Sequence, residues 1–159
     1  EDRWQDALKS AERAGEIDPC APYVLSSLCS ALAALRRLEE AAERATIAAE
    51  EGESYEVARL AIFYMCEMAE TLDRGERLAV LERARRLAEK LPTLAPLADR
   101  ETQSSFAHAK LNIAQLLDDH GEMEKWAKEV RSPFYRRVLE NLRKNPTGVR
   151  IRLPFRRVR

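Results

Sequence analysis

Two alanine triplets at a fixed separation constrain the fold of this chain more than any other feature. They lie in WQDALKSAERAGEIDP and RLEEAAERATIAAEEG, and each pair is 34 residues apart: Ala7 with Ala41, Ala11 with Ala45, and Ala14 with Ala48. A methyl side chain lets helix backbones approach closely, and alanine has the highest helix propensity. The triplets therefore predict helix pairs that stack on one another with a 34-residue period.

Turn and capping signals divide the chain into short helices. The expected helices cover residues 2–15, 21–36, 38–50, 55–72, 76–91, 100–119, 122–130 and 133–144. Pro22 fits the first turn of the second helix, and Ser54 and Asp99 are good N-caps for the fourth and sixth. Gly52 and Gly121 are expected to end the third and sixth helices. Connections this short favour antiparallel neighbours.

The fourth helix differs from the others because it is apolar nearly all round, from Val57 to Ala69. A helix of this kind is buried on two sides. We expect Leu60, Phe63 and Tyr64 in the core, between the second and sixth helices or their immediate neighbours. The proline-containing stretch LPTLAPL, after the fifth helix, is expected to be a loop.

Charge is distributed unevenly, although 27 basic and 27 acidic residues balance overall. Residues 131–159 hold ten basic side chains and one acid, a net charge of +9, so the first 130 residues carry −9. Within 146–159, Val149, Ile151 and Leu153 alternate with arginines, which is strand periodicity. We expect residues 1–145 to form a helical domain and 146–159 to be an extended basic segment. That segment docks on the acidic body or begins a following domain; nucleic-acid binding is disfavoured.

The intervals within each unit match a known repeat. Ala7, Ala11, Ala14 and Pro19 keep the spacing of the second helix of a tetratricopeptide repeat, and Leu25, Cys29 and Leu32 fit its first helix. Over residues 2–144 the chain resembles this family, with a lengthened repeat at 54–91. The resemblance implies an all-α fold, a right-handed α-solenoid of antiparallel helix pairs. A helical bundle without repeats is the alternative.

The same resemblance implies a function. Family members bind peptides in a concave groove that is lined by the first helix of each pair. Six residues are expected to face such a groove and contact a peptide or protein partner: Tyr23, Ser26, Ser30, His108, Asn112 and Gln115. Small and polar side chains suit hydrogen bonding to an extended peptide. The alternative is that several of them pack against a neighbouring helix.

Two other functions remain open. RIRLPFRRVR resembles the entry strand ahead of the catalytic cysteine in bacterial papain-like peptidases of the double-glycine-leader type. The chain would then be an N-terminal accessory domain that positions substrate for a C-terminal enzyme. The third possibility is a regulator that contacts nucleic acid through its basic end.

The residues themselves carry no catalytic signal. The sequence has no phosphate loop, HExxH or Gly-x-Ser-x-Gly motif, so we expect no enzyme activity and no cofactor in this segment. Asp118-Asp119-His120 can be interpreted as a metal site, but solvated residues that help to end a helix are the simpler interpretation. Cys20, Cys29 and Cys66 lack CxxC spacing, which favours buried thiols over a disulfide or metal site. We expect a cytoplasmic, bacterial interaction module, a piece of a longer protein without a membrane segment.

Overall fold

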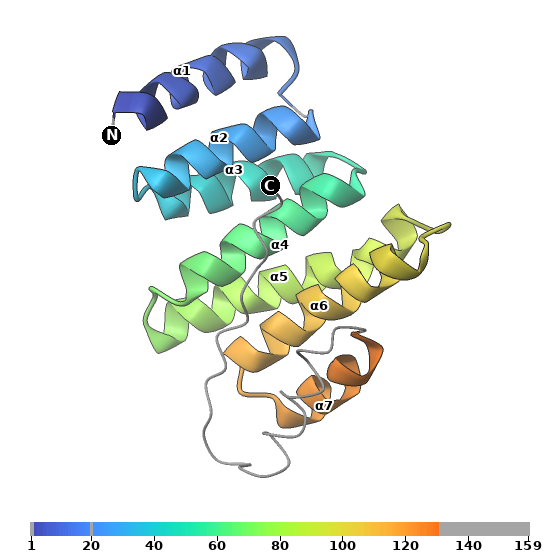
Figure 1. Cartoon of the computed structure of the whole chain (residues 1–159). Coiled ribbons are helices and arrows are strands. Elements are labelled where there is room, and N and C mark those ends of the chain that lie inside the picture. The colour runs from blue at the N-terminus through green and yellow to red at the C-terminus, as the bar shows by residue number, and fades with distance from the viewer. Residues whose placement is uncertain (1, 20, 131–159) are drawn as a thin grey trace. The chain divides into compact units, whose positions relative to one another are not determined.

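The computed structural model describes residues 2–19 and 21–130. Within these ranges the chain is all-α, with seven helices and no strand. The chain divides into two compact units, an N-terminal unit of residues 1–98 and a C-terminal unit of residues 99–159. Figure 1 labels the helices of both units. Each unit is described by itself.

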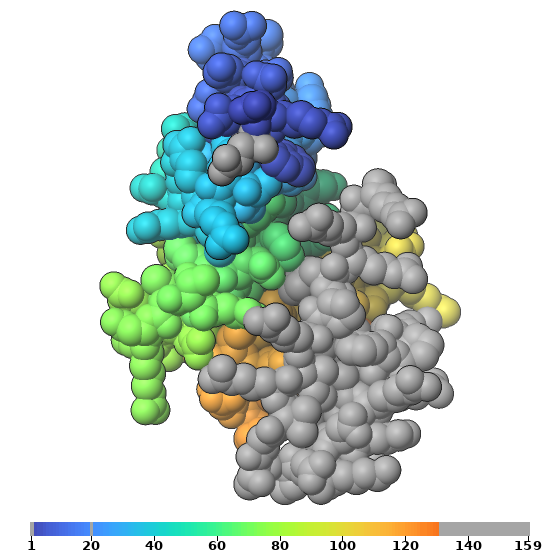
Figure 2. All heavy atoms as spheres, turned by 60° about the vertical axis from the view of Figure 1, so that its left-hand side comes forward, coloured from blue at the N-terminus to red at the C-terminus, as the bar shows by residue number. Residues whose placement is uncertain are grey.

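The N-terminal unit contains five helices: α1 (Asp2–Ile17), α2 (Pro22–Ala34), α3 (Leu38–Glu51), α4 (Tyr55–Ala69) and α5 (Arg74–Leu94). Each helix packs on the next one along the chain, and α2 also contacts α4. The turns that join α2 to α3 and α4 to α5 lie at the same side of the unit (Figure 1). Figure 2 brings that side forward and shows the light-blue surface of α2 above the light-green surface near the second turn. The two helix pairs therefore have the same orientation.

Three predicted helix starts are confirmed, two of them by a side-chain hydrogen bond. Pro22 is the first residue of α2. The Ser54 hydroxyl accepts a hydrogen bond from the Val57 amide at 3.4 Å, and the Asp99 carboxylate accepts one from the Thr102 amide at 2.8 Å. Side-chain caps of this kind satisfy amide groups that the first helical turn leaves without a partner.

The end of α3 is also as predicted, because Gly52 is its C-cap. The Gly52 amide donates a hydrogen bond to the Ala48 carbonyl at 3.1 Å. A Cβ at position 52 would lie only 2.9 Å from that same oxygen. Glycine is required here by close approach to the preceding turn, with no left-handed backbone conformation involved.

α5 is longer than predicted at both ends. It begins at Arg74, since the Asp73 carboxylate accepts hydrogen bonds from the amides of Gly75 and Glu76 at 2.9 and 3.1 Å. It continues through Pro92 to Leu94, so the prediction that LPTLAPL is entirely a loop was wrong. Pro92 lies in the last turn, where the missing amide costs one intrahelical hydrogen bond and the helix ends soon after.

Burial in the middle of the N-terminal unit follows the alanine pattern. Ala41 and Ala45 have no exposed surface, and Ala48 is also buried, which confirms the prediction for this triplet. α4 packs on both α3 and α5. Its buried side chains cover most of its circumference, which confirms two-sided burial: Val57, Ala58, Ala61, Ile62, Tyr64, Met65, Cys66 and Ala69. Leu60 and Phe63 are only half-buried, so placing them fully in the core was wrong.

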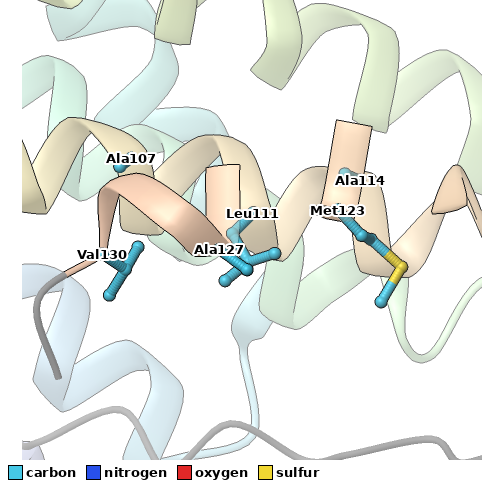
Figure 3. Packing of buried hydrophobic residues seen from close by; sticks show 6 residues of the cluster. All are labelled: Ala107, Leu111, Ala114, Met123, Ala127 and Val130. Carbon is cyan, nitrogen blue, oxygen red and sulfur yellow. The ribbon is translucent and has the colours of Figure 1, made fainter. Parts of the chain in front are cut away.

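The C-terminal unit contains α6 (Arg100–Leu116) and α7 (His120–Glu129), which pack on each other. Figure 3 shows the cluster between them. Its members are all buried and apolar: Ala107, Leu111, Ala114, Met123, Ala127 and Val130. Small side chains alternate with large ones, which allows the two helices to lie close together.

The connection between α6 and α7 corrects one prediction. Gly121 was expected to end α6, but α6 ends at Leu116, and Asp118 just beyond it takes a left-handed backbone conformation with φ 55°. Aspartate tolerates this conformation because its short side chain can hydrogen-bond locally. Gly121 lies in the first turn of α7, where Asp119 is the N-cap and accepts from the Glu122 amide at 3.1 Å.

Several predictions fall on residues outside the described ranges. They are the helix at 133–144, the extended basic segment at 146–159, and the peptidase resemblance carried by RIRLPFRRVR. Cys20 is also outside these ranges. Among the described residues, no helix combines the length and apolar character needed to cross a lipid bilayer.

Candidate functional site

Three of the predicted partner-binding residues follow one another along α2. Tyr23 is 75% exposed, Ser26 is half-buried and Ser30 is exposed. Their spacing of three and four residues places them on one face of the helix. On the adjacent edge, the Ser27 hydroxyl donates to the Tyr23 carbonyl at 2.9 Å. The face presents an aromatic ring and hydroxyl groups, both of which can contact a peptide backbone.

This face is connected to α4 through a pair of hydroxyl groups. Ser30 Oγ and Tyr64 Oη lie 3.4 Å apart, and the two residues are separated by 34 positions. The Tyr64 ring is buried and packs edge-on against Phe63, with ring centroids 4.9 Å apart. Sequence reasoning placed Tyr64 in the core and missed its polar contact. The 34-residue offset from Ser30 was the signal that could have revealed it.

The other three predicted residues lie on α6, in the C-terminal unit. His108, Asn112 and Gln115 are all half-buried, and their spacing of four and three residues places them on one helix face. Burial lowers the pKa of His108, so its imidazole is neutral over more of the physiological range. The six predicted residues thus form two separate sets, one on each unit.

A further cluster on the C-terminal unit was not predicted as a site. The ammonium groups of Lys110 and Lys125 lie 4.3 and 4.5 Å from the ring centroid of Trp126. The Trp126 indole donates a hydrogen bond to the Glu122 carboxylate, which Lys125 also contacts at 3.1 Å. The Trp126 ring is partly buried and packs against the edge of the α6–α7 cluster. The contact of Lys110 on α6 with Trp126 on α7 helps to hold the two helices together.

The described cysteines, Cys29 and Cys66, are buried thiols that form no disulfide with each other, as predicted. The Cys29 thiol donates a hydrogen bond to the Ala41 carbonyl at 3.4 Å. Burial raises the pKa of Cys29 to about 12, so the thiol stays protonated at neutral pH. A protonated thiol is neither a nucleophile nor a metal ligand, and Cys29 acts as a small core residue.

Asp118, Asp119 and His120 belong to the connection into α7. Asp118 takes a left-handed backbone conformation just after α6, and the Asp119 amide donates a hydrogen bond to the Ala114 carbonyl at 2.9 Å, so the prediction that these acids help to end the preceding helix is confirmed. Asp119 also caps α7, whose first residue is His120, a role that the prediction missed. The physical reason is that a carboxylate accepts hydrogen bonds from the free amides of a helix start. Within the described ranges, no three His, Cys, Asp or Glu side chains are grouped so that they could hold a metal ion.

No protein-family model matches this sequence, and no match was found among curated proteins or solved structures. The resemblance to tetratricopeptide repeats therefore stays a prediction that rests on spacing.

Proposed function

We propose that this chain is a protein-interaction module, built as a right-handed α-solenoid of tetratricopeptide-like helix pairs. The proposal makes α2–α3 and α4–α5 successive repeats and α1 the second helix of a preceding one. It is supported by the equal orientation of the two pairs (Figure 1) and by the contact of α2 with α4. In a stack of this kind, the first helices of successive pairs are neighbours along one face.

The burial pattern supports a repeat that lengthens in its second helix. Four buried positions of α3 have buried counterparts on α5 that are 39 residues later: Ala42 with Leu81, Ala45 with Ala84, Ala48 with Leu87, and Ala49 with Ala88. The first helices keep the shorter offset of 34 between Ser30 and Tyr64. The difference of five residues is accommodated by the turn before α5 and by the longer α5, and this agrees with the expected lengthened repeat.

The observation that carries the functional proposal is the hydroxyl contact between Ser30 and Tyr64. Through this contact the exposed face of α2 continues onto α4. In the proposed repeats, Ser30 and Tyr64 occupy equivalent positions. We propose that an extended peptide lies across this α2–α4 face, with Tyr23 against its side chains and Ser26 and Ser30 hydrogen-bonded to its backbone. Exposed tyrosine is a frequent anchor in such interfaces because its ring buries a large area at little entropic cost. The proposal assigns no chemical step and no cofactor to these residues.

Selection from a random peptide library displayed on phage tests this function. Peptides enriched on the full chain are synthesised, and their affinity is measured by fluorescence anisotropy. Tyr23→Ala and Ser30→Arg should each weaken binding by about tenfold or more, because one removes the anchor and the other blocks the hydroxyl pair.

The control is an exposed residue on another surface. Glu39 is exposed on α3, and Glu39→Gln should leave the peptide affinity unchanged. Circular dichroism should show the same helix content for all variants. The proposal is wrong if no peptide is enriched, or if enriched peptides bind the Tyr23 and Ser30 variants as tightly as the parent.

A further inference from the structure

A second surface of the N-terminal unit has the form of a groove. α1 packs on α2 and on no other described helix, so α1 and α3 are separated, with α2 between them (Figure 1). The resulting groove encloses about 760 Å³, a volume typical of ligand sites. We call it the acidic groove. It lies along α1 and α3 and includes none of Tyr23, Ser26 or Ser30.

The floor and walls of the acidic groove are apolar. Val24, Leu25, Leu28 and Leu32 of α2 form the floor. Leu28 is half-buried, and Ile47, on the wall that α3 provides, is 43% exposed. The groove thus offers apolar surface that another side chain could cover, at a gain of roughly 25 cal/mol for each Å² removed from water.

The rims of the groove carry almost only negative charge. Glu12 and Glu16 lie one turn apart on α1, and Glu40, Glu43 and Glu51 lie along α3. Arg44 is the one basic residue among the lining side chains. Arg37 binds the Glu40 carboxylate at 2.6 Å, whereas the other four glutamates make no ion pair within the described residues. Two acidic rims therefore face each other across an apolar floor.

We propose that the acidic groove binds a basic segment of a partner protein, in which apolar side chains are flanked by lysine or arginine. The apolar side chains contact Leu28 and Ile47, and the basic groups pair with the glutamates of the two rims. Charge complementarity determines this choice of occupant: an acidic or neutral segment would bury the same apolar area without neutralising the rims. The proposal does not depend on peptide binding at the α2–α4 face.

A pair of synthetic peptides tests the proposal on the full chain. In the first, leucine pairs alternate with lysine–arginine pairs; in the second, glutamate replaces every basic residue. Fluorescence anisotropy should show saturable binding of the basic peptide, weakened by added salt because exposed charges are screened. The triple variant Glu12→Gln, Glu16→Gln, Glu43→Gln should lower this affinity by about tenfold, since each exposed pair contributes a few-fold at most.

A second triple variant controls for net charge. Glu53→Gln, Glu70→Gln, Glu76→Gln removes the same charge from exposed positions outside the groove, and it should bind the basic peptide as the parent does. Tyr23→Ala should also keep the parent affinity, which separates this surface from the α2–α4 face. Equal losses in both triple variants would mean general attraction to an acidic protein and would overturn the proposal.

Filling the groove tests the apolar contact without changing charge. A Cβ built on Gly15 meets Val24 Cγ1 at 4.0 Å, an ordinary contact, so Gly15→Leu should fold and occupy part of the groove. This variant should bind the basic peptide several-fold more weakly than the parent. Unchanged binding by Gly15→Leu, or tight binding of the acidic peptide, would contradict the proposal.

The remaining outcomes concern other occupants. Analytical ultracentrifugation that shows a dimer of the parent, dissociated by the groove triple variant, would assign the groove to a second copy of the chain. A gain in peptide affinity on replacing Arg150, Arg152, Arg156 and Arg157 by glutamine would assign it to the chain's own basic segment. Either result would overturn a partner protein as the occupant.

Discussion

α1 and α3 carry the same alanine triplet, yet they are buried to different extents. In α3 all three alanines are buried, whereas in α1 Ala11 is buried, Ala14 is half-buried and Ala7 is exposed. The difference follows from their neighbours, because α3 packs on both α2 and α4, whereas among the described helices α1 packs on α2 alone. A small-residue pattern thus marks a face that can pack closely, and the number of neighbouring helices determines how much of that face is buried.

The largest expected effect on stability is at α4, the second helix on which α3 packs. Ile62 on α4 is almost fully buried, whereas Ile17 at the end of α1 is 88% exposed. Ile62→Ala should lower the free energy of unfolding by about 2–5 kcal/mol, since it leaves a cavity. Ile17→Ala should change it by less than about 0.5 kcal/mol. Urea denaturation of both variants measures the difference, and equal effects would contradict the burial assigned to α4.

The next test places the same substitution in both triplets. Ala45 is fully buried. Ala45→Leu therefore places a larger side chain in a closely packed site, and overpacking should lower the free energy of unfolding by about 1–3 kcal/mol. Ala7→Leu is at an exposed position of α1 and should stay within about 0.5 kcal/mol of the parent. Thermal denaturation followed by circular dichroism compares the two. If Ala45→Leu is as stable as the parent, the packing of α3 described here is wrong.

Hydrogen exchange should distinguish α1 from α3 in the unmutated protein. A helix that packs on one neighbour opens more readily than one held on two sides. We expect central amides of α1 to exchange at least about tenfold faster than those of α3, which corresponds to about 1.4 kcal/mol. Mass spectrometry of peptic fragments measures both helices in one experiment. Equal protection would show that α1 is held by more than its contact with α2.

The smallest effect comes from an ion pair that α3 makes and α1 lacks within the described residues. Arg83 of α5 holds the Glu50 carboxylate with two hydrogen bonds, at 2.8 and 2.7 Å. Both side chains are substantially exposed, so Glu50→Gln should cost less than about 1 kcal/mol.

The pH dependence of this pair has a definite sign. The hydrogen bond from Arg83 lowers the pKa of Glu50 in the folded state below its ordinary value. The folded state therefore holds this proton less tightly than the unfolded state, and the stabilisation is present above the unfolded pKa. It should disappear as the pH falls through the lowered folded pKa, where Glu50→Gln and the parent become equally stable. A difference that persists at lower pH would contradict this assignment.

Local signals in the sequence were sufficient for most helix boundaries. Pro22, Ser54 and Asp99 act through hydrogen bonds and backbone angles within one turn, and such effects can be predicted without the rest of the fold. Position 118 shows the limit of this reasoning. Gly121 was expected to end α6, but the helix already ends at Leu116, and Asp118 takes the left-handed conformation that follows it.

The candidate sites were less predictable than the helices. The spacing of Tyr23, Ser26 and Ser30 shows that they share a helix face, because the helical period alone places them there. The contact of Ser30 with Tyr64 requires α2 and α4 to be neighbours, which the 34-residue offset only suggested. The acidic groove has no counterpart in any local pattern, since its rims come from two helices that do not pack on each other.

The sequence by itself determined the all-α class, most helix boundaries and the faces of α3 and α4 that can pack closely. These features depend on periodicity, capping and side-chain size, which act over a few residues. The tertiary structure alone decided which alanines are buried, that Tyr64 reaches Ser30, and that α1 and α3 leave a groove between them. These features depend on which helices become neighbours, and that choice follows from the packing of many side chains at once.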